Sequence, residues 1–428
     1  MKSKPYEIIH LKNNLKVVLY PKKGLSSVFL TYWIKCGEIN DLYEKKGLAH
    51  LLEHLILENT SDLNSEKFNK RQEQLGGGFN GQVGTIYTKI EGLFHKDEME
   101  EVVMLVKDMF FNRHFTQENV ESSKKIVLEE MKTICNEPID IASKEYSLAR
   151  FRGKYSFSLP ASGSKSTLAK ITLSDIKTFY QEYYQPKNCL LVIAGDFEVN
   201  NIHKCIEIIF KEIKDSDIIT AKPEKPKFST KNVIIKKYPF SGVTSILSFP
   251  AYHTQIPIKK RVALILLGNL LAGSASSRLY NLLRVKKNLI YDIQKNFSSQ
   301  EYFGMFTLDW TVSKNNYIEV LEIVVKEFNK LKNKKITLEE LINLRKIANR
   351  ADALDFESAY DCSNWVADEM LFEKQILLPE DYKKIRDRIS PNDLLEVARE
   401  IFDFSKVNLI IIGKTNGLNR QELLRCLN

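Results

Sequence analysis

Residues 47–60 read GLAHLLEHLILENT, an almost wholly apolar segment that holds two histidines and a glutamate within five residues. On a helix with 100° per residue, His50, Glu53 and His54 share one side with Leu57. The other, broad side is apolar and consists of Leu48, Ala49, Leu51, Leu52, Leu55 and Ile56. A solvated helix face would carry lysine, serine and glutamine instead. The sequence therefore predicts a buried helix whose ionisable groups need partners.

A divalent metal ion is one such partner. His50 and His54 are spaced i, i+4, so both rings can bind one ion, and Glu53 lies on the same face. This is the order of the inverted zinc-peptidase motif H-x-x-E-H. The alternative is a pair of buried histidines hydrogen-bonded to carbonyl groups, which suits a single histidine better than this arrangement. A catalytic zinc site also needs a third protein ligand.

The segment IVLEEMKTICNEP at 126–138 offers two candidates for that ligand, Glu129 and Glu130. Read as a helix, Glu130 falls inside the apolar stripe and Glu129 outside it; the stripe consists of Ile126, Val127, Met131 and Ile134. A carboxylate on a buried face is costly unless it is ligated or paired. The pattern predicts Glu130 as the third ligand, unless an arginine or lysine elsewhere pairs with it.

Composition narrows the possible functions. The chain has 428 residues and a formal charge of +9 from scattered lysines, without a basic block of the kind that binds nucleic acid. Its longest apolar run, VALILLGNLLAG, is too short to span a bilayer. The six cysteines form no C-x-x-C pair and stand in apolar surroundings, which is typical of reduced thiols. We expect a cytoplasmic protein with no membrane span.

Residues 214–230, KDSDIITAKPEKPKFST, have the prolines and charges of a linker between domains 1–213 and 231–428. Each half ends with a helix, a buried strand and a glycine, and aligning Gly195 with Gly413 places Asp175 on Asp393 without a gap. Helical patterns at 115–137 and 257–272 lie between the strands. We predict an α+β fold of two homologous domains, each a mostly antiparallel sheet packed with helices. Two unrelated α+β domains are the alternative.

Several motifs occur together in the order of one known family. They are GEINDLYEKKGLAHLLEHLILENT, LGGGFNGQVGTIYT, IVLEEMKTICNEP, FYQEYYQPKNCLLVIAGDF and LLAGSASSRLYNLLRVKKNLIYDI. With the 76 residues that separate His54 from Glu130, they resemble the pitrilysin/insulinase family of zinc metallopeptidases over nearly the whole chain. The resemblance implies that His50, His54 and Glu130 bind one Zn²⁺ per chain, with Glu53 as general base.

The resemblance also implies how substrate is bound. Arg284 and Tyr291 would contact it near the scissile bond, and the segment from Gly78 to Gly84, with Asn80, would offer an edge strand to an extended peptide. In relatives of this length two chains enclose a chamber, which implies a homodimer or a heterodimer with a homologous subunit. Arg284 and Tyr291 would then serve the metal centre of the other subunit.

The implied activity is endoproteolysis of unfolded or extended peptides. Two alternatives remain: a dedicated leader-peptide or precursor-processing protease that works with a homologous partner, and a non-catalytic subunit of the same family. Two positions depart from the family pattern. Ser123 stands where many relatives carry a second glutamate, and Glu58-Asn59 replaces a usual Lys-Gly.

Overall fold

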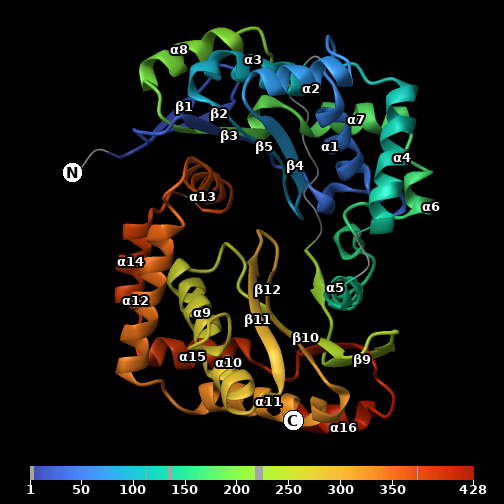
Figure 1. Ribbon diagram of the computed structural model, residues 1–428, viewed down its shortest axis with the longest axis vertical. Coiled ribbons are helices and arrows are strands. Elements are labelled where there is room, and N and C mark those ends of the chain that lie inside the picture. Colours follow the sequence, from blue (N-terminus) through green and yellow to red (C-terminus); the bar gives the residue numbers. More distant parts are fainter. Residues whose placement is uncertain (1–3, 112, 134–136, 217–224, 374) are drawn as a thin grey trace. The chain divides into compact units, whose positions relative to one another are not determined.

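The computed structural model describes residues 4–111, 113–133, 137–216, 225–373 and 375–428 (Figure 1). Within these, the chain forms two compact units. Unit 1 takes its residues from Met1–Lys132, Tyr155–Glu224 and Asp355–Ile376. Unit 2 takes its residues from Thr133–Lys154, Lys225–Leu354 and Leu377–Asn428.

Unit 1 is built on a six-stranded sheet in the order β1-β2-β7-β3-β5-β4. Neighbouring strands run antiparallel except for the parallel pair β2 and β7. The strands are β1 Glu7–His10, β2 Lys16–Pro21, β3 Ser27–Ile34, β4 Gly78–Val83, β5 Thr88–His95 and β7 Cys189–Gly195. Its helices are α1 Leu48–Glu58, α2 Ser65–Gln74, α3 Met99–Phe110, α4 Gln117–Thr133, α6 Lys165–Leu168, α7 Leu173–Tyr183, α8 Val199–Ile209 and α13 Ala359–Phe372.

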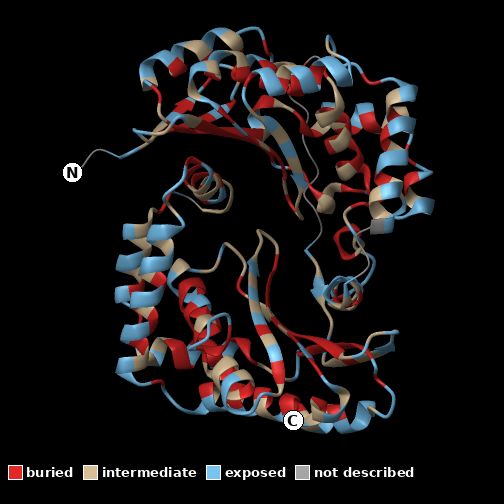
Figure 2. Ribbon diagram, in the orientation of Figure 1, coloured by how far each residue is buried: buried red, intermediate tan, exposed pale blue. Residues whose placement is uncertain are grey.

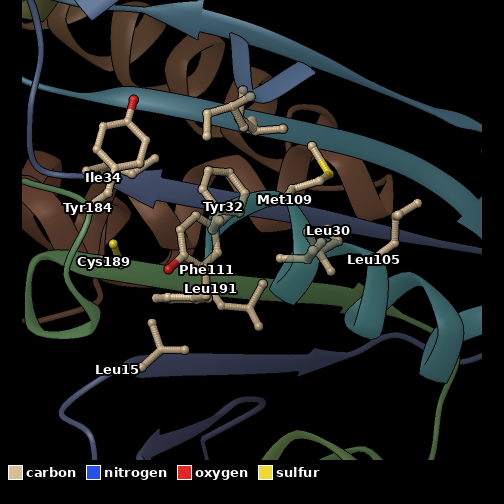
Figure 3. Packing of buried hydrophobic residues seen from close by; sticks show 14 of the residues in the cluster. Leu15, Leu30, Tyr32, Ile34, Leu105, Met109, Phe111, Tyr184, Cys189 and Leu191 are labelled. Carbon is tan, nitrogen blue, oxygen red and sulfur yellow. The ribbon is translucent and has the colours of Figure 1, made fainter. Parts of the chain in front are cut away.

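The central strands of unit 1 are buried on both faces, which explains their continuous apolar sequences. On one face of β3, Leu30 and Tyr32 pack into the main core beneath α3 (Figure 3), where the Tyr32 ring stacks on Phe110 with centroids 4.0 Å apart. On the other face, Phe29 meets Tyr360 of α13 edge to face at 4.9 Å. Figure 2 shows the resulting buried strands flanked by helices with one exposed side.

Unit 2 holds a five-stranded sheet in the order β11-β12-β10-β13-β9, with one parallel pair, β13 and β9. The strands are β9 Asn232–Lys237, β10 Val243–Ala251, β11 Ile290–Ser299, β12 Gly304–Val312 and β13 Asn408–Gly413, and a short pair joins β6 Phe151–Arg152 to β8 Lys227–Phe228. Its helices are α5 Pro138–Ala149, α9 Ile258–Leu271, α10 Arg278–Tyr280, α11 Tyr317–Asn333, α12 Leu338–Leu354, α14 Pro379–Asp387, α15 Pro391–Ile401 and α16 Arg420–Cys426.

The two sheets repeat one topology, because β2-β7-β3-β5-β4 matches β9-β13-β10-β12-β11 in order and in direction. The aligned aspartates also do the same work. Asp175 closes a capping box at the start of α7 and pairs with Lys45 at 2.7 Å, and Asp393 closes one at the start of α15 and pairs with Lys259 at 2.8 Å. The predicted fold class, two homologous α+β domains, is confirmed.

Each unit also receives one helix from the other half of the sequence. Helix α13 packs on β3 and β7 of unit 1, and α5 packs on β10 and β13 of unit 2. Both helices follow a 17-residue helix, α12 and α4 respectively, so the exchange is itself part of the repeat. The two compact units therefore differ from the predicted domains 1–213 and 231–428 in the placement of these two helices. Within the predicted linker, residues 217–224 lie outside the described residues.

None of the helices formed by the described residues is both long and apolar enough to cross a membrane. The five cysteines within the described ranges are unpaired thiols, and Cys36, Cys189 and Cys362 are buried. Cys135 lies outside the described residues.

Candidate metal centre

A glycine at the N-cap, Gly47, lets the chain turn sharply into helix α1. Gly47 adopts the left-handed conformation with φ 103°, and a Cβ there would lie 2.6 Å from a carbonyl oxygen of Ser162. The carboxylate of Asp41 accepts hydrogen bonds from the main-chain nitrogens of Gly47 at 2.9 Å and Ala49 at 2.8 Å, and so satisfies the open N-terminus. As predicted from periodicity, the broad apolar side is buried: Leu48, Ala49, Leu51, Leu52, Leu55 and Ile56.

Helix α4 presents Glu130 to α1, but its inner face differs from the predicted stripe. Ile126 is 46% exposed, so its assignment to the buried face was wrong. Ile134 lies outside the described residues. The buried positions are Val120, Ser123 and Val127, and their spacing of three and four residues leads on to Glu130. Glu129 points into solvent, where Lys132 pairs with it at 2.6 Å.

Two helices thus bring three metal-binding groups together. Ligand atoms of His50, His54 and Glu130 all lie within 4.8 Å of one another. Oε2 of Glu130 is 3.3 Å from Nε2 of His54 and 3.7 Å from Nε2 of His50. The two imidazole rings stand nearly perpendicular, with centroids 4.7 Å apart. Glu53 lies beside the cluster, with Oε2 3.9 Å from Nε2 of His54.

Burial sets the protonation of the cluster in the absence of metal. Desolvation, helped by the charges of His54 and Lys46, lowers the pKa of His50 to about 4. His50 is therefore a neutral imidazole at physiological pH, the form that binds metals. Desolvation, with repulsion from Glu130, raises the pKa of Glu53 to about 8. A perturbed carboxyl beside two histidines is typical of a functional site.

The edge strand β4 passes directly over Glu53. A Cβ built on Gly81 would lie 1.7 Å from Oε1 of Glu53, so the glycine makes room for the carboxylate. Gly81 alternates along β4 with Gly78 and Asn80, which are exposed. Gly81 was missed at the sequence level, although alternation from Phe79 and Val83 would have placed it on the inward face.

The N-terminal end of β4 is already hydrogen-bonded on its open side. Oε1 of the buried Gln72 accepts a hydrogen bond from the main-chain nitrogen of Phe79 at 2.7 Å. Main-chain groups alternate in direction along an antiparallel strand, so those of Gly81 point to the same open edge. Gln72 was not identified from the sequence, because the polar pattern of α2 gives no sign that this glutamine is buried.

Arg284 and Tyr291 belong to unit 2, where they contact each other. The guanidinium of Arg284 lies over the Tyr291 ring at 5.0 Å from its centroid and donates to Asn288 Oδ1 at 3.3 Å. Arg284 lies in the π-helical segment η6 Asn281–Lys286, and Tyr291 lies where the register of β11 shifts between Ile290 and Ile293. Tyr291 is 80% exposed, so it is not a core tyrosine.

Comparisons with known proteins agree with this geometry. A family described as Insulinase (Peptidase family M16) matches residues 16–159, which include both histidines, Glu53 and Glu130. A family described as Peptidase M16 inactive domain matches residues 170–347. Zinc protease PqqE of Helicobacter pylori is 28% identical over 411 residues, 93% of this chain and 90% of that protein. The uncharacterized zinc protease YmxG of Bacillus subtilis is 26% identical over 412 residues, 96% of this chain and 94% of that protein.

Solved structures share the fold. A protease from Helicobacter pylori matches with a TM-score of 0.87 at 22% identity, over 95% of this chain and 99% of that one. A peptidase M16 inactive domain from Pseudomonas fluorescens matches with a TM-score of 0.85 at 17% identity, over 96% of this chain and 98% of that one. With both halves matched by M16 peptidase families and the H-x-x-E-H helix set against Glu130, the chain belongs to the pitrilysin/insulinase family, M16, of peptidases.

Proposed function

We propose that this protein is a zinc-dependent endopeptidase. The observation that carries the proposal is the convergence of His50, His54 and Glu130 beside the buried carboxyl of Glu53. Two imidazoles and one carboxylate form a known ligand set of catalytic zinc, which leaves a fourth position for water or substrate. Relatives named zinc proteases support the same assignment.

Two of the three distances between donor atoms, both from Glu130, fit a zinc ion. Bonds of about 2.1 Å in a tetrahedral site place ligand atoms roughly 3.4 Å apart, and Oε2 of Glu130 lies 3.3 Å and 3.7 Å from the two histidine nitrogens. When bound, zinc supplies a Lewis acid that acidifies a water molecule and polarises a carbonyl. His50, neutral because it is desolvated, is ready to bind without losing a proton.

Glu53 carries the proton in this proposal. Its carboxylate takes a proton from the attacking water and delivers it to the leaving amine. It is only 5% exposed, so few solvent molecules compete for that proton. The charge on Glu130 that raises the Glu53 pKa is one that a cation would offset, which favours the ionised form needed in a base.

We infer that the substrate is an extended peptide bound along β4. At the open edge of β4, next to Glu53, the main-chain groups of Gly81 would form hydrogen bonds with the peptide backbone. Gly78 and Asn80, in the same strand, would lie along the bound peptide. Tyr291, exposed and held against Arg284, is suited to donate a hydrogen bond to the developing oxyanion. Such binding selects chain conformation rather than side chains, as expected for unfolded peptides.

The proposal extends to assembly and location. Two homologous chains, as a homodimer or a heterodimer, would form the chamber, and the unpaired cysteines favour the reducing cytoplasm. The description of one matched family as an inactive domain keeps a non-catalytic subunit as the second candidate. All four motif residues, however, fall within the range matched by the other family.

The test is metal content together with cleavage of a mixed, unrelated peptide library by the purified chain. Stoichiometric zinc with cleavage of many peptides is the expected result. Bound zinc without cleavage would instead favour a dedicated precursor protease that needs its partner. Absence of zinc from a folded protein supplied with zinc would contradict the proposal and favour the non-catalytic subunit.

A further inference from the structure

A buried glutamine lies against the edge strand that passes over Glu53. Gln72 belongs to the inner face of α2, four residues after the fully buried Phe68, where a helical pattern calls for an apolar side chain. Gln72 is only 8% exposed, and a buried amide needs partners. Its Oε1 accepts a hydrogen bond from the main-chain nitrogen of Phe79 in β4 at 2.7 Å. The glutamine therefore occupies a hydrogen-bonding position on the outer edge of the sheet.

The side chain of Gln72 is fixed by its own surroundings. Its amide nitrogen donates to Asn69 Oδ1 at 3.3 Å. Its main-chain oxygen accepts hydrogen bonds from the nitrogens of Leu75 at 3.1 Å and Gly77 at 3.2 Å, in the turn that leads into β4. A Cβ built on Gly78 would lie 3.7 Å from Oε1 of Gln72, so the amide also lies against the start of the strand. The amide thus belongs to the fold of α2 and β4 before any ligand binds.

The part of the edge that stays open lies next to Glu53. Main-chain groups alternate in direction along β4, so those of Gly81 and Val83 reach the edge beyond Phe79. On a paired peptide, the residue that faces Gly81 is two residues, about 6.6 Å, from the position opposite Phe79. The acceptor that a peptide would bring to Phe79 is already supplied by Gln72. A peptide that follows this edge past Glu53 must therefore leave the sheet there.

A Gly-rich, polar edge strand gives little control over how far another chain pairs with it. Strand β4 reads GFNGQV, and its exposed positions are Gly78, Asn80 and Gln82. Open edges of this kind also invite pairing with unrelated chains. A side chain that takes up one end of the edge confines pairing to the part beside Glu53.

We propose that Gln72 ends the peptide-binding edge of β4, so that substrate pairing begins at Gly81 and excludes Phe79. Gln72 then determines how many substrate residues are bound on one side of the cleaved bond, and it touches neither the metal nor the reacting atoms. The inference rests on the proposed function, because it requires an extended peptide along β4. It also narrows that function, since Gly78 lies beyond the stop and makes no main-chain pair with the substrate.

The test is a scan of the main-chain hydrogen bonds made by a bound peptide. A library peptide that the wild type cleaves is made as a set with one main-chain nitrogen methylated at a time, and affinities are measured on zinc-loaded, full-length Glu53→Gln. Methylation should weaken binding about 2–10-fold at alternate residues, those that pair with the edge. Adding Gln72→Ala should lengthen this series by one position, two residues beyond its end, because the Phe79 nitrogen loses its internal acceptor.

Two further variants serve as controls. Gln74 lies exposed on the same helix, so Gln74→Ala should leave the series unchanged. Gln72→Glu keeps an acceptor oxygen at the same reach and should retain the shorter series. An identical series with and without Gln72→Ala would overturn the inference, even if that variant melts at a lower temperature, because a purely structural link between α2 and β4 changes stability alone.

Site-resolved hydrogen exchange provides a second readout that leaves Gln72 in place. In zinc-loaded Glu53→Gln, the Phe79 amide should be protected without peptide and gain nothing on binding, whereas the Gly81 amide should gain protection. Equal gains at both amides would mean that the peptide displaces Gln72, and would reject the stop. If no library peptide binds, or if binding protects neither amide, the proposed function or its binding mode fails first, so the two failures are distinguishable.

Discussion

Oε2 of Glu130 lies 3.3 Å from Nε2 of His54, whereas its neighbour Glu129 pairs with Lys132 in solvent. We expect Glu130→Gln to weaken zinc binding strongly, because it removes a metal ligand and its negative charge. The loss should exceed the ~10–100-fold that is typical when a residue hydrogen-bonded to a metal ligand is replaced. Glu129→Gln, one residue away, should bind zinc like the wild type. Chelator competition on both variants checks this. A larger loss in Glu129→Gln would mean that helix α4 is wrongly oriented.

Glu53 lies beside the cluster but acts, in our proposal, on water rather than on the metal. Glu53→Gln should therefore lower kcat by at least ~10²–10⁴-fold, while the zinc content stays at that of the wild type. Metal analysis and a peptide assay on the same preparation provide the measurement. Zinc lost in parallel with activity would make Glu53 a ligand and the motif reading wrong.

In the metal-free protein, the contribution of Glu53 to stability should fall as pH rises. The pKa of Glu53 is raised from its usual value of 4.5 to about 8, so the folded state holds this proton more tightly than the unfolded chain. The stabilisation is full below pH 4.5 and is lost as pH rises through 8. Glu53→Gln removes this dependence. Between pH 5 and 9, the melting temperatures of the wild type and of Glu53→Gln should be similar at pH 5. At pH 9 the variant should melt at the higher temperature. Parallel curves would contradict the prediction.

The exchange of helices predicts that the first half of the chain does not fold alone. Residues 1–216 lack α13 and the residues just before it, which leaves Phe29 and Tyr20 of the sheet without the aromatic rings of Tyr360 in α13 and of Phe356. Each large apolar side chain left in water costs about 1.5–3 kcal/mol. We expect this fragment to bind a hydrophobic dye and to unfold without cooperativity.

The control for that experiment is the same fragment joined to residues 355–376 through a flexible linker. It should bind little dye and melt in one sharp transition, because α13 packs on β3 and β7. If the shorter fragment already melts cooperatively, α13 is not needed to complete unit 1.

Much of the fold and of the metal cluster can be predicted from local sequence patterns. The apolar side of α1 follows from periodicity, and the gapless alignment of Asp175 with Asp393 agrees with the capping box that each one closes. These features depend on neighbours within one or two helical turns, which a sequence displays directly.

The features that escaped the sequence depend on distant packing. Ile126 is exposed because the inner face of α4 is set by where α1 lies, not by the local apolar count. Amphipathic patterns mark α5 and α13 as helices with a buried side but do not say which sheet each will cover. Gln72 and Ser123 are buried polar residues whose partners lie in other elements, Phe79 in β4 and Glu58 in α1, and composition gives no sign of that.

The final prediction concerns where Arg284 and Tyr291 act. Each chain supplies one unit with the metal cluster and one unit with the Arg284–Tyr291 pair, and the shared sheet topology makes β11, which carries Tyr291, the counterpart of β4. We expect the pair to complete the site of a second chain. Tyr291→Phe should then lower kcat by about 10²–10³-fold, the usual loss for one oxyanion donor. The accompanying rise in KM should be smaller.

Mixing two inactive variants tests this arrangement. One is Glu53→Gln and the other is Arg284→Ala with Tyr291→Phe. If the site is shared between chains, a mixed dimer has one site with both defects and one intact site, so activity returns on subunit exchange. If each chain completes its own site, every site in the mixture carries a defect and the mixture stays inactive. Verified mixed dimers without activity would therefore place the pair in its own chain's site, whereas recovered activity requires Tyr291 to reach across to the partner's metal.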